Sequence, residues 1–272
     1  MLLPISRRAA LSRLALGSAS FWAPLSLSTA AAAATTLSSL PPLQEQHKRL
    51  YLIRHGETDW NAENRIQGST DKKLNAIGLG QAEALRSYLA AAPLDLIASS
   101  NLSRAAQTAD AVAASHPSAR RIPGQSAFAE MCFGDFEGLR LEEFDAEYKA
   151  FLKAWRNGEN SKAFPGYSGE CAGESPNDVA KRGLDGLRSL GVLPGGSLAS
   201  GVRGTERHVL VAAHGRFNKI LIAALKGDVS TASDVEQGNT AINILDLTPE
   251  GGVVARALNL REHLQPAAAA AG

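Results

Sequence analysis

Acidic side chains are absent from the first 44 residues, and the first carboxylate in the chain belongs to Glu45. This stretch contains a twin arginine, Arg7-Arg8, and then an uncharged run over residues 14–31. An acid-free N-terminus rich in Arg, Ser and Ala is typical of organelle transit peptides, and a twin arginine before an uncharged run is typical of one export signal. We therefore predict that residues 1–35 are a targeting segment. The protein is then expected in an organelle, such as a mitochondrion or a plastid with its thylakoid lumen, or outside the cell, rather than in the cytosol.

Long apolar runs, cysteine and net charge are also scarce. Pro24 and several serines interrupt the uncharged run, so we expect no stable membrane span in the mature protein. Cys132 and Cys171 lack the spacing of a zinc or redox motif and are most simply two free thiols, although an oxidising compartment would allow them to pair. A net charge of +1 gives no reason to expect nucleic acid or an anionic membrane as a partner.

The composition permits one domain with a substantial core. Hydrophobic residues make up 44% of the 272 residues, and no internal repeat is visible. We predict a linker over residues 36–47, a single domain over residues 48–264 and a disordered, alanine-rich tail over residues 265–272.

Apolar runs that end abruptly at polar residues predict buried strands, and apolar residues at helical spacing between them predict helices. The expected strands cover residues 49–53, 94–98, 208–213, 240–247 and 253–258, and the last two form a hairpin. The expected helices cover residues 79–91, 104–115, 176–190 and 217–226, and Leu141, Phe144, Tyr148 and Trp155 mark one more. This alternation favours an α/β fold with three layers, α/β/α, around a mostly parallel central sheet.

Cationic residues follow three of the predicted strands. Arg54 and His55 end the first strand, the second leads into a segment that contains Arg104, and His214 ends the third. Ligands of such sheets bind at the carboxyl ends of the strands. The pattern therefore predicts an anion site built from these four side chains.

Five ordered segments resemble the histidine phosphatase family, whose fold is phosphoglycerate-mutase-like. They are Arg54-His55-Gly56-Glu57-Thr58-Asp59-Trp60-Asn61, Asn64-Arg65-Ile66-Gln67-Gly68, Ser99-Ser100-Asn101-Leu102-Ser103-Arg104, Glu130 with Gly134-Asp135-Phe136-Glu137-Gly138, and Ala213-His214-Gly215. The similarity covers roughly residues 49–260. It implies a phosphatase that works through a phosphohistidine intermediate on His55.

The residue types fit phosphoryl transfer, which requires mainly positioning and charge stabilisation from a protein. Arg54 and Arg104 are planar cations that can clamp phosphate oxygens in pairs. His55 can attack through one ring nitrogen while a hydrogen bond, most simply to the backbone, holds the other. His214, if protonated, adds a further donor, but the sequence does not settle its charge, because arginines and phosphate act on it in opposite directions.

Other roles come from the resemblance. It implies that Glu130 is the general acid and then the general base, with Asp135 and Glu137 as competing acids and Glu137 more often structural. It also implies that Asn61 donates an amide hydrogen bond to the phosphate. Three further substrate-binding positions follow from it: Gln67, Gly68 and Gly215.

No metal or cofactor is expected. The carboxylates are not spaced as metal ligands, and two histidines beside two arginines would repel a divalent cation. In this interpretation Arg54, Arg104 and His214 neutralise the charge that a metal would otherwise neutralise.

The acid segment favours a phosphatase over a mutase. Cofactor-dependent phosphoglycerate mutases typically carry Glu-Arg-His-Tyr-Gly there, whereas this chain has Glu130-Met-Cys-Phe-Gly134, and residues 139–165 contain no adjacent basic pair. A mutase remains the first alternative, and a non-catalytic protein that binds a phosphorylated ligand is the second. The expected partner is a small phosphorylated metabolite, whose identity would be set by residues 139–174.

Overall fold

The computed structural model describes residues 36–169 and 171–265. The predicted targeting segment, residues 1–35, lies outside the described residues, as does the predicted tail from residue 266 onwards. Within the described part, the predicted linker includes a short 3₁₀ turn, Leu37–Ser39, whose Leu37 packs on a core cluster of the domain. No helix in this part of the chain is long and apolar enough to cross a membrane.

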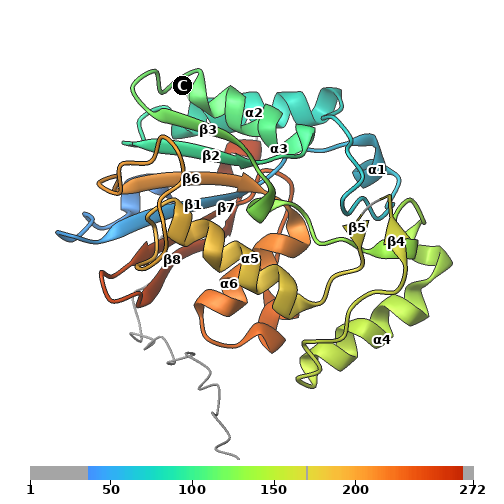
Figure 1. Ribbon diagram of the computed structural model, residues 1–272. Helices are drawn as coiled ribbons and strands as arrows, with labels where there is room; N and C mark the ends of the chain where they lie inside the picture. The colour runs from blue at the N-terminus through green and yellow to red at the C-terminus, as the bar shows by residue number, and fades with distance from the viewer. Residues whose placement is uncertain (1–35, 170, 266–272) are drawn as a thin grey trace, which may run out of the picture.

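A six-stranded sheet forms the centre of the molecule (Figure 1). Its spatial order is β3 (Arg120–Gln125), β2 (Leu96–Ser100), β6 (His208–Ala213), β1 (Lys48–Arg54), β7 (Ile242–Leu247) and β8 (Val253–Leu260). The first four strands in this order run parallel, and β7 and β8 are antiparallel to their neighbours. The predicted mostly parallel sheet and the predicted hairpin are therefore confirmed.

Helices cover both faces of the sheet (Figure 1). Helices α2 (Ala76–Leu89) and α3 (Ser103–Ala113) pack on one face, and α5 (Pro176–Ser189) and α6 (Gly215–Leu225) pack on the other. Strand β1 shows how the sequence permits this, because Leu50 and Leu52 enter one core cluster while Tyr51 and Ile53 enter the other. A central strand buried on both sides is therefore apolar at consecutive positions, here residues 50–53, rather than at alternate positions.

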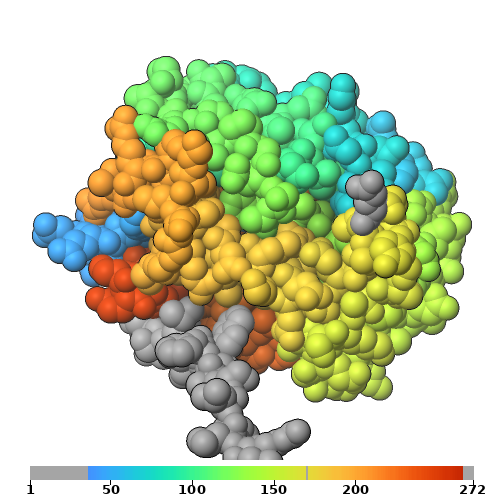
Figure 2. Space-filling view, in the orientation of Figure 1, coloured from blue at the N-terminus to red at the C-terminus, as the bar shows by residue number. Residues whose placement is uncertain are grey.

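A smaller lobe lies at the side of the sheet. It contains α4 (Asp145–Arg156) and a two-stranded hairpin of β4 (Tyr167–Ser168) and β5 (Cys171–Ala172), and α1 (Asp59–Ala62) is a single turn near it. Figure 2 shows the yellow-green surface of this lobe at one end of the molecule. Phe164 lies at the centre of its aromatic cluster, 4.5 Å from Phe151 and 5.2 Å from Trp155 between ring centroids.

The predicted elements differ from the observed ones mainly at their ends. Helix α2 begins three residues earlier than predicted, because Asn75 caps Gly78 N–H. Leu141 lies in a 3₁₀ turn before α4 instead of in the helix itself. The capping box at Ser175, with Pro176 at the first helical position, is present as predicted. Cys132 and Cys171 are free thiols, with Cys132 Sγ 3.0 Å from the carbonyl oxygen of Cys171.

Helix α2 touches the loop after β1 through a glycine. A Cβ atom at Gly78 would lie 2.0 Å from the carbonyl oxygen of Glu57, whereas a Cβ atom at Gly80 would meet nothing within 4 Å. We expect Gly78→Ala to lower the free energy of unfolding by about 1–3 kcal/mol through overpacking. Gly80→Ala, the matched control in the same helix, is expected to raise it by up to about 1 kcal/mol.

Urea denaturation of both variants measures this difference, provided that the slope with denaturant is unchanged. Equal stabilities of Gly78→Ala and Gly80→Ala would show that the close approach of helix and loop is absent.

Candidate active site

Three adjacent parallel strands, β2, β6 and β1, bring the site together at their carboxyl ends. His55 follows β1 and His214 follows β6, and the register pairs Arg54 with Ala213 on the two strands. The two imidazole rings are consequently neighbours, 5.2 Å apart between centroids. Both side chains are buried.

His55 is held in one tautomer by its own loop. Its Nδ1 lies 2.6 Å from the carbonyl oxygen of Gly56, and since a carbonyl can only accept, Nδ1 carries the proton. Burial lowers the pKa of His55 well below its usual range, and the charges of Arg104 and Arg54 lower it further. The ring is therefore neutral at physiological pH, and Nε2 presents a free lone pair.

Two arginines flank this ring, of which Arg104 is fully buried and Arg54 partly buried. Arg104, on α3, donates to the carbonyl oxygens of Thr70 (2.9 Å) and Gly68 (2.7 Å), and Arg54 donates to the carbonyl oxygen of Gln237 (2.7 Å). Burial lowers the pKa of Arg104 to about 10, so the side chain stays cationic at neutral pH. The Nε–H groups of both arginines are buried and have no partner among the described residues, so each retains a donor for an anion.

The protein's own groups act on the charge of His214 in one direction. Burial lowers the pKa of His214 well below the usual range, and the charges of Arg104, Arg182 and Arg54 act in the same direction. The ring is therefore neutral in this pocket. Its Nε2 lies 2.8 Å from the hydroxyl of Ser100, and its buried Nδ1 has no partner among the described residues. If the Ser100 hydroxyl donates to Nε2, then Nδ1–H can donate to a phosphate oxygen without any charge on the ring.

Glu130 lies at the N-terminus of α6. Its Oε2 accepts from the backbone N–H of Arg216 (3.0 Å) and its Oε1 from that of Phe217 (2.8 Å). Arg182, on α5, fixes the backbone of this segment by donating to the carbonyl oxygens of Ala129 (2.8 Å) and Glu130 (3.1 Å). The carboxyl group is therefore held firmly at the wall of the site.

The remaining predicted residues surround the two histidines. Asn61 accepts through Oδ1 from Thr58 N–H and from the Asn239 amide, both at 3.3 Å, so its own NH₂ group can face a ligand. The Oε1 atom of Gln67 accepts from the Thr58 hydroxyl at 2.9 Å.

The two predicted glycines are constrained by their neighbours. Gly68 has a φ of 51°, and a Cβ atom there would lie 1.9 Å from Oε1 of Glu137. That carboxylate accepts from Ser69 N–H and Thr70 N–H, so Glu137 anchors the loop, as the resemblance implied. A Cβ atom at Gly215 would approach the guanidinium of Arg54 to 3.3 Å.

A cavity of about 260 Å³ joins these residues, and all the predicted site residues line it except His214, which is fully buried beside His55. Sequence reasoning missed seven lining residues as site residues: the apolar Ile66 and Phe133, and the polar Arg65, Tyr148, Arg216, Lys219 and Gln237. Two of them could have been found from the sequence, because Arg216 and Lys219 follow His214 closely and lie in the first turns of α6.

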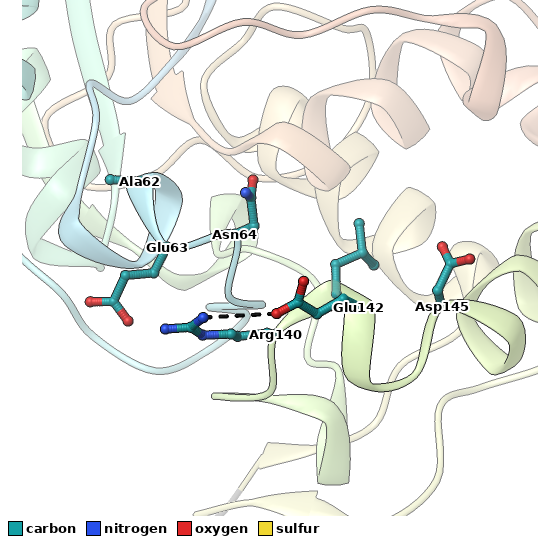
Figure 3. A pocket seen from close by; sticks show the side chains of 7 residues that line it. Ala62, Glu63, Asn64, Arg140, Glu142 and Asp145 are labelled. Atoms are coloured by element: carbon teal, nitrogen blue, oxygen red, sulfur yellow. Dashed lines mark ion pairs between the residues drawn. The ribbon is translucent and has the colours of Figure 1, made fainter.

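A second, wider cavity of about 780 Å³ lies near α1 and the start of α4 (Figure 3). Glu63, Glu142 and Asp145 line it, and Arg140 pairs with Glu142 at 3.8 Å. Its carboxylates would repel a phosphate, so the smaller cavity at the strand ends is the better anion site. Among residues 36–169 and 171–265, no three His, Cys, Asp or Glu side chains are grouped as metal ligands.

Comparison with known proteins agrees with this geometry. The model of the histidine phosphatase superfamily (branch 1) matches residues 50–260. The chain is 35% identical to a glucosyl-3-phosphoglycerate phosphatase of Mycolicibacterium vanbaalenii over 180 residues, which are 66% of this chain and 75% of that protein. It is 31% identical to the 2-carboxy-D-arabinitol-1-phosphatase of Triticum aestivum over 78% of this chain but only 39% of that protein.

Solved structures show the same likeness. A mycobacterial glucosyl-3-phosphoglycerate phosphatase in complex with VO₃ matches with a TM-score of 0.61 and 28% identity, over 78% of this chain and 98% of that one. A phosphoserine phosphatase variant of Entamoeba histolytica, in complex with phosphoserine, matches with a TM-score of 0.61 and 26% identity, over 80% of this chain and all of that one. The chain belongs to the histidine phosphatase superfamily and is a phosphoric monoester hydrolase.

Proposed function

We propose that the protein hydrolyses a small phosphomonoester through a phosphohistidine intermediate on His55, without a metal ion. The observation that carries this proposal is the neutral His55 ring, whose Nδ1 is fixed by Gly56 and which lines a cavity together with Arg54 and Arg104.

In the first step, Nε2 of His55 attacks phosphorus and the bond to the ester oxygen breaks. Arg54, Arg104 and the Nδ1–H of His214 bind the phosphate oxygens, and Glu130 gives a proton to the departing alkoxide. In the second step, Glu130 accepts a proton from water, whose oxygen attacks phosphorus. The bond between phosphorus and Nε2 then breaks, and inorganic phosphate leaves.

The charges in the cavity support independence from metal. In many phosphoryl transfers a divalent cation neutralises the oxygens of the transferred group. Here two permanently charged guanidinium groups occupy that place, and each keeps an uncommitted buried Nε–H. A divalent cation between them would be repelled.

The relatives favour hydrolysis over transfer. Two of them are named as phosphatases of phosphorylated sugar acids, and a probable phosphoglycerate mutase of Salmonella choleraesuis is 33% identical over 55% of this chain. The acid segment, Glu130-Met-Cys-Phe-Gly134, lacks the Arg-His-Tyr that typically follows the acid of cofactor-dependent mutases. Water is therefore the proposed acceptor of the phosphoryl group.

The direct test is hydrolysis of p-nitrophenyl phosphate and of a panel of sugar, glycerate and serine phosphates in the presence of EDTA. We expect release of inorganic phosphate at the same rate with and without the chelator. Full dependence on a divalent metal would contradict the mechanism, and no turnover of any ester would favour a non-catalytic binding protein. Formation of 2-phosphoglycerate from 3-phosphoglycerate with added bisphosphoglycerate, in place of hydrolysis, would identify a mutase.

A further inference from the structure

The cavity contains more positive charge than a phosphomonoester requires. Its lining includes five cationic side chains and a single carboxylate: Arg54, Arg65, Arg104, Arg216, Lys219 and Glu130. A monoester dianion brings two negative charges, which Arg54 and Arg104 can balance. Arg65 is already paired with Glu63 at 2.5 Å. The charges of Arg216 and Lys219 then remain, because Glu130 is protonated in its proposed role as general acid.

The protein offsets the charge of Lys219 only in part, since Glu236 and Glu130 raise its pKa without cancelling the lowering by burial and by neighbouring cations. No ion pair among the described residues includes Arg216 or Lys219. Glu130 lies close to them, but both its oxygens accept backbone N–H groups of α6. A cation that is partly buried beside other cations is costly unless an anion accompanies it.

Their position is set by the helix. Arg216 and Lys219 are three residues apart on α6, so they share one face of it. Arg216 is held by Tyr148 of α4, since its Nη2 donates to the Tyr148 hydroxyl and its guanidinium lies 5.6 Å from the ring centroid. Arg216 thus reaches toward α4 in the smaller lobe, whereas Arg54 and His55 lie at the end of β1 and Arg104 lies in the first turn of α3.

The lowered pKa of Lys219 also indicates that its charge lacks a full counter-charge. Burial lowers the pKa of Lys219 to about 8, and the positive charges of Arg216 and Arg54 contribute. Lys219 stays mostly protonated at neutral pH, and a bound anion would offset the repulsion from the neighbouring cations and raise its pKa again.

We propose that Arg216 and Lys219 bind a second anionic group, a carboxylate or a further phosphate, on the alcohol part of the substrate. The preferred substrates are then phosphomonoesters of small anionic alcohols. This inference rests on the proposed phosphatase function, with the first phosphate at His55. The volume of about 260 Å³ suits such compact substrates.

The test compares matched esters. 3-Phosphoglycerate and glycerol 1-phosphate have the same carbon skeleton but differ by one carboxylate, and glucose 1,6-bisphosphate and glucose 6-phosphate differ by one phosphate. In at least one pair, we expect kcat/KM to be roughly 10- to 100-fold higher for the ester that carries the second anionic group. This factor corresponds to the free energy of a charge-assisted hydrogen bond. The pair with the larger ratio identifies the second anion.

The variant Lys219→Met removes the ammonium while it keeps most of the side-chain volume. We expect it to reduce the ratio within the responsive pair by about 10-fold or more, chiefly through KM. Lys226→Met is the matched control, because Lys226 caps the other end of α6 and does not line the cavity. It should leave both ratios unchanged.

The two proposals fail in different ways. If the enzyme hydrolyses the esters but both ratios are near one, or if Lys219→Met does not alter a ratio above one, the second anion site is absent while the phosphatase function stands. If no ester in either pair or in the wider panel is hydrolysed, the proposed function itself fails.

Discussion

Replacing His55 with alanine is expected to lower kcat by about 10⁴- to 10⁶-fold for every substrate, as loss of a covalent nucleophile does in other enzymes. The reason lies in the geometry of the ring. Nδ1 is committed to Gly56, and His55 is the one histidine among the described residues that line the cavity. In the proposed tautomer of His214, Nε2 accepts from Ser100 and Nδ1 carries a proton, so neither of its ring nitrogens can attack phosphorus. Steady-state kinetics with p-nitrophenyl phosphate measures the loss.

His47→Ala provides the control, because it makes the same chemical change outside the cavity. Its kcat should equal that of the wild-type protein. A rapid alkaline quench of the wild-type enzyme during turnover should trap phosphate on a histidine, and His55→Ala should trap none. Activity of His55→Ala within about tenfold of wild type would contradict the nucleophile assignment.

Replacing Glu130 with glutamine is expected to lower kcat for alkyl phosphates by about 10²- to 10⁴-fold, the usual contribution of a general acid. The loss should be much smaller for p-nitrophenyl phosphate in the first step, because a nitrophenolate leaves without a proton. Burst kinetics with both esters separates that step from hydrolysis of the intermediate. The dependence on the leaving group is the result that identifies proton donation.

Glu137→Gln distinguishes this role from a structural one. Glu137 is the competing acid in the sequence, but its oxygens accept from Ser69 N–H and Thr70 N–H. We expect Glu137→Gln to reduce thermal stability and to lower the rates for both esters by the same factor. A dependence on the leaving group in Glu137→Gln but not in Glu130→Gln would reverse the assignment.

The sequence predicted the central strands well because their physical signal is local. The segment His208–Ala213 is a continuous apolar run, and it forms strand β6 with those bounds. Strand β3, Arg120–Gln125, was missed because it contains Pro123 and Gly124 and only Ile122 in it is buried. It lies at the edge of the sheet, where a proline is tolerated and the apolar pattern is weak.

The site was predictable as a set of residues but not as a chemical state. Adjacent strand ends in a parallel sheet were enough to expect Arg54, His55 and His214 in one place. The neutral state of His214 depends on burial and on Arg104, which only the packed structure provides. The second pair of cations was missed for a similar reason, since the direction of Arg216 is set by Tyr148 on another element.

The attachment of Glu130 to α6 also bears on how this enzyme could acquire new substrates. The carboxylate binds the backbone N–H groups of residues 216 and 217, not their side chains. Those donors persist whatever side chain follows the His-Gly motif, with proline at 216 or 217 as the exception. Substrate selectivity can therefore change through substitutions at positions 216 and 219 while the carboxyl group of Glu130 keeps its position. A change of substrate then does not require the loss of the general acid.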